Sequence, residues 1–227
     1  MPGSRPAVLP AERVAPGVWR LPLRGVNAYA LEAEGGPVLV DAGNPGDAPR
    51  LAAMLAGAGL GMPRAVLLTH GDVDHAGGVR GLLRAGDPDL WAPAGEAEVL
   101  AGRGRPRAMR RLGRLLTGRL RCDRALAPGE EAAGLRVVAT PGHTPGHCSF
   151  LREGDGVLFA GDALAVRDGA VRLVGPPFTE DAAAAFASLR RIAELGPRLL
   201  LPGHGDPLPD PGQALARALE APPPAGR

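Results

Sequence analysis

Short apolar runs that end in a polar tract recur along this chain and constrain its fold more than any other feature. The tracts begin at or just after the residues expected to end each strand, and they contain Asp41, His70, His143, Asp162 and His204. Apolar side chains at helical spacing separate several of the runs, as in residues 47–58 and 180–195. This alternation indicates an α/β fold. Since such strand ends converge on one edge, the sequence predicts a site there.

The predicted elements can be given as residue ranges. We expect strands at 26–31, 37–40, 65–69, 135–139, 148–151, 157–160 and 198–201, and helices at 47–58 and 180–195. With 227 residues, of which 45% are hydrophobic, the chain has enough apolar surface for one domain without a disulfide. We therefore expect a single domain over 1–227, with an Arg-rich helical insert at 95–124 and a frayed tail at 221–227.

Charge and hydropathy narrow the expected partners. The formal net charge is +2 and the acidic residues are spread along the chain, so no nucleic-acid partner is expected. No apolar run reaches the ~20 residues that cross a bilayer, and no signal-peptide pattern is found, so we expect a cytoplasmic protein without a membrane partner. The expected partner is a small-molecule substrate, and the sequence leaves open whether the protein forms a homodimer.

The Arg-rich insert has two possible roles. Its arginines, Arg110, Arg111 and Arg114 among them, form either a basic wall for an anionic substrate or a solvated helix face, and we favour the helix face.

The densest polar tract places His70, Asp72, Asp74 and His75 within six residues. Two carboxylates crowded into one loop repel each other, and the imidazoles need partners, so a divalent cation relieves both problems. Nitrogen and carboxylate ligands together suit zinc, iron or manganese. The tract therefore predicts a metal site.

This tract resembles the His-x-His-x-Asp-His signature of the metallo-β-lactamase superfamily, with Asp72 in place of the second histidine. Later tracts at 140–147, 159–162 and 201–205 are similar to the family's other ligand loops, and 39–43 is similar to its supporting strand. The resemblance implies the metallo-β-lactamase fold, a four-layer αβ/βα sandwich. It also implies two divalent metal ions, with zinc first and iron or manganese open. The implied ligands are His70, Asp72 and His143 for one ion, Asp74, His75 and His204 for the other, and Asp162 between them.

The resemblance further implies a metal-dependent hydrolase, and residues 141–147 look like the loop of glyoxalase II-type enzymes. In such an enzyme a metal-bridging hydroxide attacks a small ester, thioester or lactone, and Asp74 and Asp162 are the expected catalytic residues. Asp72 makes the first site more anionic and keeps a second class open, a non-haem iron redox protein similar to flavodiiron proteins or persulfide dioxygenases. A binding module with structural metals is disfavoured, because structural sites are usually closed.

Two further residues are expected to support the ligands rather than to bind metal. His147 follows His143 by four positions in the same loop, and Asp41 ends the early strand. Hydrogen bonds from such neighbours orient metal ligands in many sites. We therefore expect both side chains to tie the ligand loops together.

Overall fold

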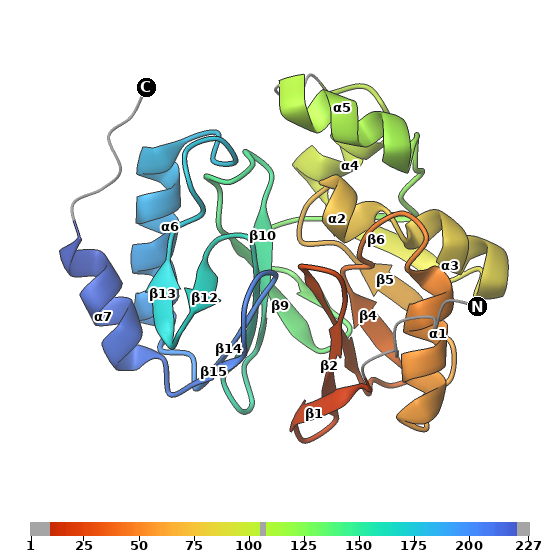
Figure 1. Cartoon of the computed structure of the whole chain (residues 1–227), viewed down its shortest axis with the longest axis horizontal. Helices are drawn as coiled ribbons and strands as arrows, with labels where there is room; N and C mark the ends of the chain where they lie inside the picture. Colours follow the sequence, from red (N-terminus) through yellow and green to blue (C-terminus); the bar gives the residue numbers. More distant parts are fainter. Residues whose placement is uncertain (1–9, 105–107, 222–227) are drawn as a thin grey trace, which may run out of the picture.

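A computed structural model describes residues 10–104 and 108–221, except for the side chains of Ala108, Met109, Arg111, Leu112 and Arg114. All of the expected tail except Ala221 lies outside the described residues. The elements form two main sheets with helices on their outer sides (Figure 1).

The first sheet contains its strands in sequence order, β1 to β7. Its strands are β1 (Glu12–Ala15), β2 (Val18–Pro22), β3 (Asn27–Leu31), β4 (Val38–Val40), β5 (Ala65–Leu67), β6 (Asp89–Pro93) and β7 (Arg124–Leu126). Pairing is antiparallel from β1 to β4 and parallel from β4 to β7. The parallel strands β4 and β5 therefore end at the same edge of the sheet.

The second sheet has the order β15-β14-β11-β10-β9-β8. Its strands are β8 (Glu131–Ala132), β9 (Leu135–Ala139), β10 (Cys148–Arg152), β11 (Val157–Gly161), β14 (Leu199–Pro202) and β15 (Leu208–Pro209). β11 and β14 pair in parallel, so the carboxyl ends of these two strands lie at the same edge of the sheet. A separate hairpin of β12 (Ala165–Arg167) and β13 (Ala170–Arg172) lies beside this sheet.

Helices flank both sheets (Figure 1). On the side of the first sheet lie α1 (Ala48–Gly57), α2 (Val73–Ala76), α3 (Val79–Gly86), α4 (Ala94–Leu100) and α5 (Ala108–Thr117). On the side of the second sheet lie α6 (Ala182–Leu195) and α7 (Gly212–Glu220). The segment expected to be a helical insert thus contains most of α4 and all of α5.

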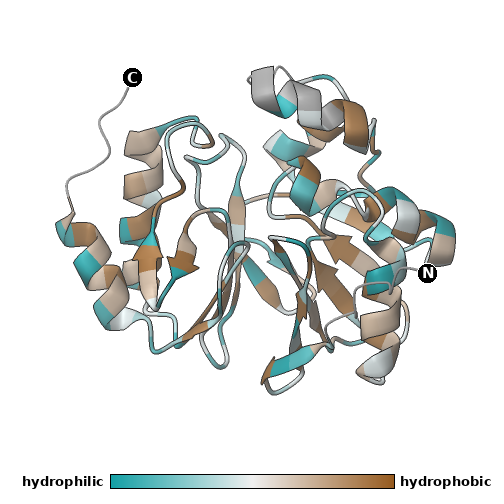
Figure 2. Cartoon of the chain, in the orientation of Figure 1, coloured by the Kyte–Doolittle hydropathy of each residue, from teal (hydrophilic) through white to brown (hydrophobic). Residues whose placement is uncertain are grey.

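Three apolar clusters separate the layers. One lies between the two sheets and includes Tyr29, Leu67, Phe150 and Phe159. The other two join each sheet to its own helices, as α1 and α3 pack on the first sheet and α6 and α7 on the second. Hydrophobic residues accordingly concentrate on the strands (Figure 2). The predicted four-layer αβ/βα sandwich is confirmed.

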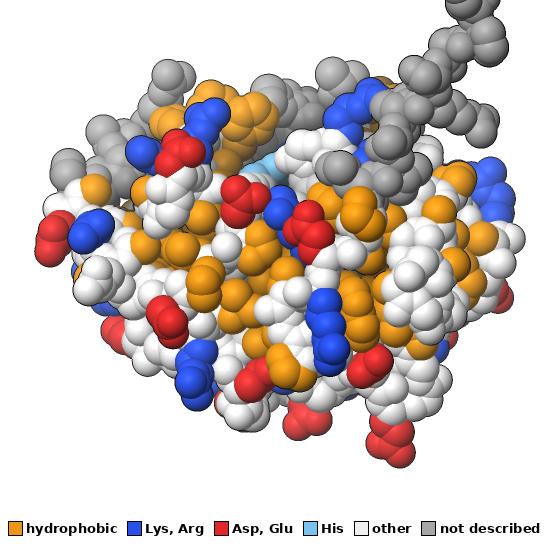
Figure 3. All heavy atoms as spheres, turned by 60° about the horizontal axis from the view of Figure 1, so that its bottom comes forward, with side chains coloured by type: hydrophobic (Ala, Val, Ile, Leu, Met, Phe, Trp, Pro, Cys, Tyr) orange, Lys and Arg blue, Asp and Glu red, His pale blue; other side chains and the backbone are white. Residues whose placement is uncertain are grey.

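The outer surface carries charges of both signs. On the face shown in Figure 3, acidic and basic side chains are interspersed rather than gathered by sign. None of the helices in the described part of the chain is long and apolar enough to cross a membrane.

Candidate metal centre

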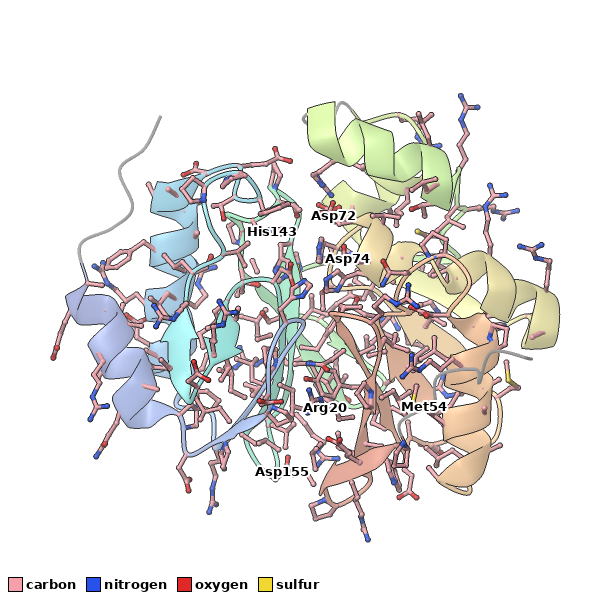
Figure 4. The ribbon with its side chains drawn as sticks, viewed as in Figure 1. Arg20, Met54, Asp72, Asp74, His143 and Asp155 are labelled. Carbon is pink, nitrogen blue, oxygen red and sulfur yellow. The ribbon has the colours of Figure 1, made fainter. Side chains whose placement is uncertain are left out.

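The loops that follow β5, β9, β11 and β14 meet at one end of the sandwich. Asp72 and Asp74 come from the side of the first sheet and face His143, which comes from the side of the second (Figure 4). The structure brings together all of the predicted ligands, in two neighbouring groups. Their assignment as metal ligands remains a prediction.

The first group is built around two imidazoles. His70 Nε2 and His143 Nε2 are 3.2 Å apart. Asp72 Oδ2 lies 3.1 Å from His143 Nε2 and 3.8 Å from His70 Nε2. Asp162 Oδ2 lies 3.6 Å from His143 Nε2. Four potential donor atoms from four different loop positions therefore face one small space.

The second group adjoins the first through Asp162. His204 Nε2 lies 3.3 Å from Asp162 Oδ2 and 3.4 Å from Asp74 Oδ2. His75 Nε2 lies 3.2 Å from Asp162 Oδ1 and 3.9 Å from Asp74 Oδ2. Asp162 Oδ2 is thus close to a histidine of each group, as a carboxylate placed between two metal ions must be.

These distances fit metal coordination. Donors 2.0–2.1 Å from a tetrahedral zinc ion lie roughly 3.3 Å from each other. Among the residues that the structure describes, buried His75 Nε2 and Asp162 Oδ1 have no hydrogen-bond partner, although they lie next to each other. A shared metal ion satisfies both atoms, and in the metal-free protein a proton on His75 Nε2 takes its place. The donor set and its unpaired atoms therefore fit a pair of divalent ions.

Asp41 orients one of these ligands. Its carboxylate accepts hydrogen bonds from the backbone N–H and the hydroxyl of Thr69, and Asp41 Oδ2 lies 2.8 Å from His75 Nδ1. The proton on Nδ1 is thereby fixed, and Nε2 is left free to bind a metal. Asp41 reaches this position with φ of 60°, a conformation that few residues other than glycine adopt.

His147 supports the Asp162 loop without joining either group. Its Nε2 accepts a hydrogen bond from the backbone N–H of Asp162 at 3.0 Å, and its Nδ1 lies 2.8 Å from Thr140 Oγ1. Burial lowers the pKa of His147 to about 3, so the ring is neutral and able to accept. This contact gives His147 the supporting role expected from the sequence.

Without a bound metal, the candidate histidine ligands differ in their affinity for protons. Burial, together with His75 and His143, lowers the pKa of His70 well below its ordinary value. Burial also lowers the pKa of His204, but hydrogen bonds to Asp162 and Asp74 outweigh this effect and raise the pKa to about 10. Since a ligating imidazole must be neutral, metal binding near neutral pH displaces a proton from His204.

Gly203 lets the backbone before His204 approach the other ligands. A Cβ at this position would lie 2.4 Å from Asp162 Oδ1 and 2.7 Å from His75 Cε1. Any larger residue would therefore displace ligands of the site. Gly203, next to His204 at the end of β14, is therefore required by the close packing of the candidate ligands and not by the strand.

Sequence reasoning missed the environment of Arg110. This residue of α5 was expected on a solvated helix face, but its side chain is only 10% exposed. Its Nε donates to Asp72 Oδ1, and its two terminal nitrogens lie 2.7 Å from Glu96 Oε2 and 3.2 Å from Glu180 Oε1. The prediction of a solvated helix face is therefore wrong at Arg110. The side chains of Arg111 and Arg114 are not among those that the structure describes.

A cavity of about 690 Å³ opens over both groups. Asp72, Asp74, Asp162, His143 and His204 line its floor. Its walls come from the β12–β13 hairpin and residues 173–180, including apolar Leu173, Val174 and Phe178 and the arginines Arg167 and Arg172. The candidate ligands can thus meet a molecule of moderate size that has an apolar part.

Comparisons with known proteins agree with this geometry. The sequence matches the model of the metallo-beta-lactamase superfamily over residues 21–204, a range that contains every candidate ligand. "Probable metallo-hydrolase YflN" of Bacillus subtilis is 33% identical, over 86% of this chain and 86% of its own length. A hydroxyacylglutathione hydrolase of Methylobacillus flagellatus is 34% identical, over 74% of this chain and 56% of its own length. The crystal structure of TTHA1623 in a di-iron-bound form matches with a TM-score of 0.67 and 33% identity, covering 83% of this chain and 92% of that one.

Proposed function

The chain belongs to the metallo-beta-lactamase superfamily, and from this premise we propose that it hydrolyses a small ester, thioester or lactone with two metal ions. The observation that carries the proposal is the position of both ligand groups on the floor of one cavity. His70, Asp72 and His143 would hold one ion, Asp74, His75 and His204 would hold the other, and Asp162 would contact both. Zinc is our first choice of metal, with iron or manganese next.

Two bound divalent ions supply a nucleophile from water at neutral pH and polarise the carbonyl group of a substrate. The protein residues orient the reactants and move protons. The Asp74 side chain is 32% exposed and lines the cavity, so its carboxylate is placed to accept a proton from the attacking water and return it to the leaving group. The Asp162 side chain is only 5% exposed and would fix the position of the two metal sites relative to each other.

The cavity walls support an acyl substrate. Leu173, Val174 and Phe178 offer apolar surface beside the ligand groups, and Phe178 is 58% exposed. A relative named as a hydroxyacylglutathione hydrolase adds support for a thioester. We therefore rank thioesters with an apolar acyl group first.

The test is a substrate panel with metal-reconstituted protein. We expect hydrolysis of thioesters, esters or lactones that stops after chelation and returns with zinc, manganese or iron, and about two metal equivalents per chain by elemental mass spectrometry. Hydrolysis that survives complete metal removal would contradict the proposal. So would protein that holds only iron, hydrolyses nothing and consumes oxygen with a persulfide, which would establish the redox alternative instead.

Arg167 and Arg172 predict a preference for anionic substrates. Both line the cavity from the same face of the β12–β13 hairpin, opposite buried Val166 and Val171, and neither has an ion pair with any described residue. We expect the double variant R167A/R172A to raise KM for a carboxylate-bearing ester roughly 3–10-fold, since exposed ion pairs are weak. The KM for a neutral ester of similar size should not change. Steady-state kinetics on the matched pair of esters checks this, and an equal change in both KM values would refute it.

A further inference from the structure

We propose that Arg110 is a positioning residue of the first metal site, which points one oxygen of Asp72 at His70 and His143 by binding the other. The inference rests on the metal binding proposed above, and it assigns to the Arg-rich insert a task at the metal centre.

The two oxygens of Asp72 have different partners. Arg110 Nε donates to Oδ1, whereas Oδ2 lies 3.1 Å from His143 Nε2 and 3.8 Å from His70 Nε2. A charge-assisted hydrogen bond to one carboxylate oxygen is strong and restricts the rotation of the group. Arg110 therefore favours the orientation of Asp72 in which Oδ2 faces His143 and His70, where the first ion would bind.

Arg110 is itself held by a buried anion. Glu96 is 1% exposed, and its Oε2 lies 2.7 Å from the Arg110 guanidinium. The same carboxylate accepts hydrogen bonds from the Gly71 backbone N–H at 2.9 Å and from the Thr144 hydroxyl at 2.7 Å. Glu96 thus joins α4 to the loop of His70 and to the loop of His143, and Arg110 joins this network to Asp72.

Charge explains why an arginine is needed here. Asp72, Glu96 and Glu180 all contact the Arg110 side chain, and three carboxylates gathered without a cation would repel one another. A histidine at position 72 would bring no negative charge, and Arg110 would then neutralise only Glu96 and Glu180. The aspartate in the ligand motif and the buried arginine in the insert therefore form one functional unit.

The experiment measures metal affinity by chelator competition and metal content by elemental mass spectrometry, without substrate. We expect R110M to weaken the first site about 10–100-fold, as loss of a ligand's supporting contact usually does, and to leave the second site unchanged. R110K, which keeps the charge, should lose less. R103M is the matched control, because Arg103 belongs to the same insert but is 66% exposed and, among the residues with described side chains, pairs with Glu98 alone.

Rescue separates positioning from general structural damage. The double variant D72H/R110K, which keeps a positive charge beside Glu96 and Glu180, should bind metal at the first site within a few-fold of D72H alone, because a histidine at position 72 has no carboxylate for Arg110 to orient. Wild-type affinity in R110M, or losses that simply add in the double variant, would overturn the proposal. If R110M does not fold, as judged by circular dichroism, R110K and D72H/R110K decide by the same comparison. Wild-type protein that binds two metals but hydrolyses no substrate would refute the proposed function and leave this inference standing.

Discussion

Asp162→Ala should lower kcat/KM for the best substrate by on the order of 10³-fold, equivalent to about 4 kcal/mol of transition-state stabilisation. The reason is its position: Asp162 Oδ2 lies 3.6 Å from His143 Nε2 and 3.3 Å from His204 Nε2, so one substitution removes a donor from both groups. Steady-state kinetics and metal content, measured on the same preparation, check the result. We expect metal content to fall below that of the wild type.

Asp155→Ala is the matched control for Asp162→Ala. Asp155 pairs with Arg152 in the turn between β10 and β11, at the opposite end of the molecule from Asp72, Asp74 and His143 (Figure 4). Its loss should leave kcat/KM and metal content unchanged. Comparable activity in the Asp162 and Asp155 variants would show that Asp162 does not take part in the reaction.

Asp41→Ala should lower the free energy of unfolding of the metal-free protein by about 3 kcal/mol, because it removes one partner of a buried, hydrogen-bonded ion pair. Burial lowers the pKa of His75, but Asp162 and Asp41 outweigh this effect and raise the pKa well above its ordinary value, so the ring is charged at neutral pH. The contribution of the Asp41–His75 pair to the free energy of unfolding is complete below about pH 6.5, the pKa of histidine in the unfolded chain. It disappears as the pH rises through the pKa of His75 in the folded protein. Urea denaturation at pH 6 and at higher pH checks both the size and the sign.

The same substitution should weaken the second metal site about 10–100-fold, since Nδ1 of His75 loses the acceptor that orients its ring. Asp168→Ala is the control for backbone strain, because Asp168 also has a positive φ, 52°, but lies exposed at the tip of the β12–β13 hairpin. It should change stability by less than about 1 kcal/mol. Equal losses in the two variants would attribute the effect of Asp41→Ala to the backbone alone.

The sequence predicted the strands that carry ligands because each combines an apolar run with a polar end. The expected strand 135–139 matches β9, and 157–160 matches β11 to within one residue. The early strands β1 and β2 and the strand β6 were missed. β1 has exposed or half-buried residues only, and the apolar run of β2 is interrupted by Arg20. β6 has three apolar residues, but a proline and no polar tract follows them, so none of the three strands combines an apolar run with a polar end.

The helix α3 was missed for a related reason. It contains Gly81 and Gly86, which weaken a helical pattern, and its amphipathic stripe is short. Gly81 is nonetheless required by packing, because a Cβ there would lie 2.4 Å from Ala48 Cβ on α1. Close packing between helices therefore selected a residue that local propensity disfavours.

Within the site, the sequence predicted the side chains that meet there, but not the contacts that connect them. The motifs identify His70 and Asp74 because ligands cluster within short loops. Arg110, by contrast, lies 38 positions from Asp72 within a run of arginines, and nothing in the local pattern distinguishes it from its neighbours. Glu96 is similar, as an acidic residue in a short helix that becomes buried only in the folded chain. Such partners depend on tertiary structure and not on spacing.

Each ligand group draws on both halves of the sandwich. His70 and Asp72 follow β5 of the first sheet, whereas His143 and Asp162 follow β9 and β11 of the second, and His204 follows β14. A metal ion bound by these residues would therefore cross-link the two sheets through coordination bonds, as a disulfide does through a covalent one. Since a ligand that binds only the folded state adds RT ln(1 + [L]/Kd) to stability, the concentration of free metal ions would then set the free energy of unfolding of the two halves together.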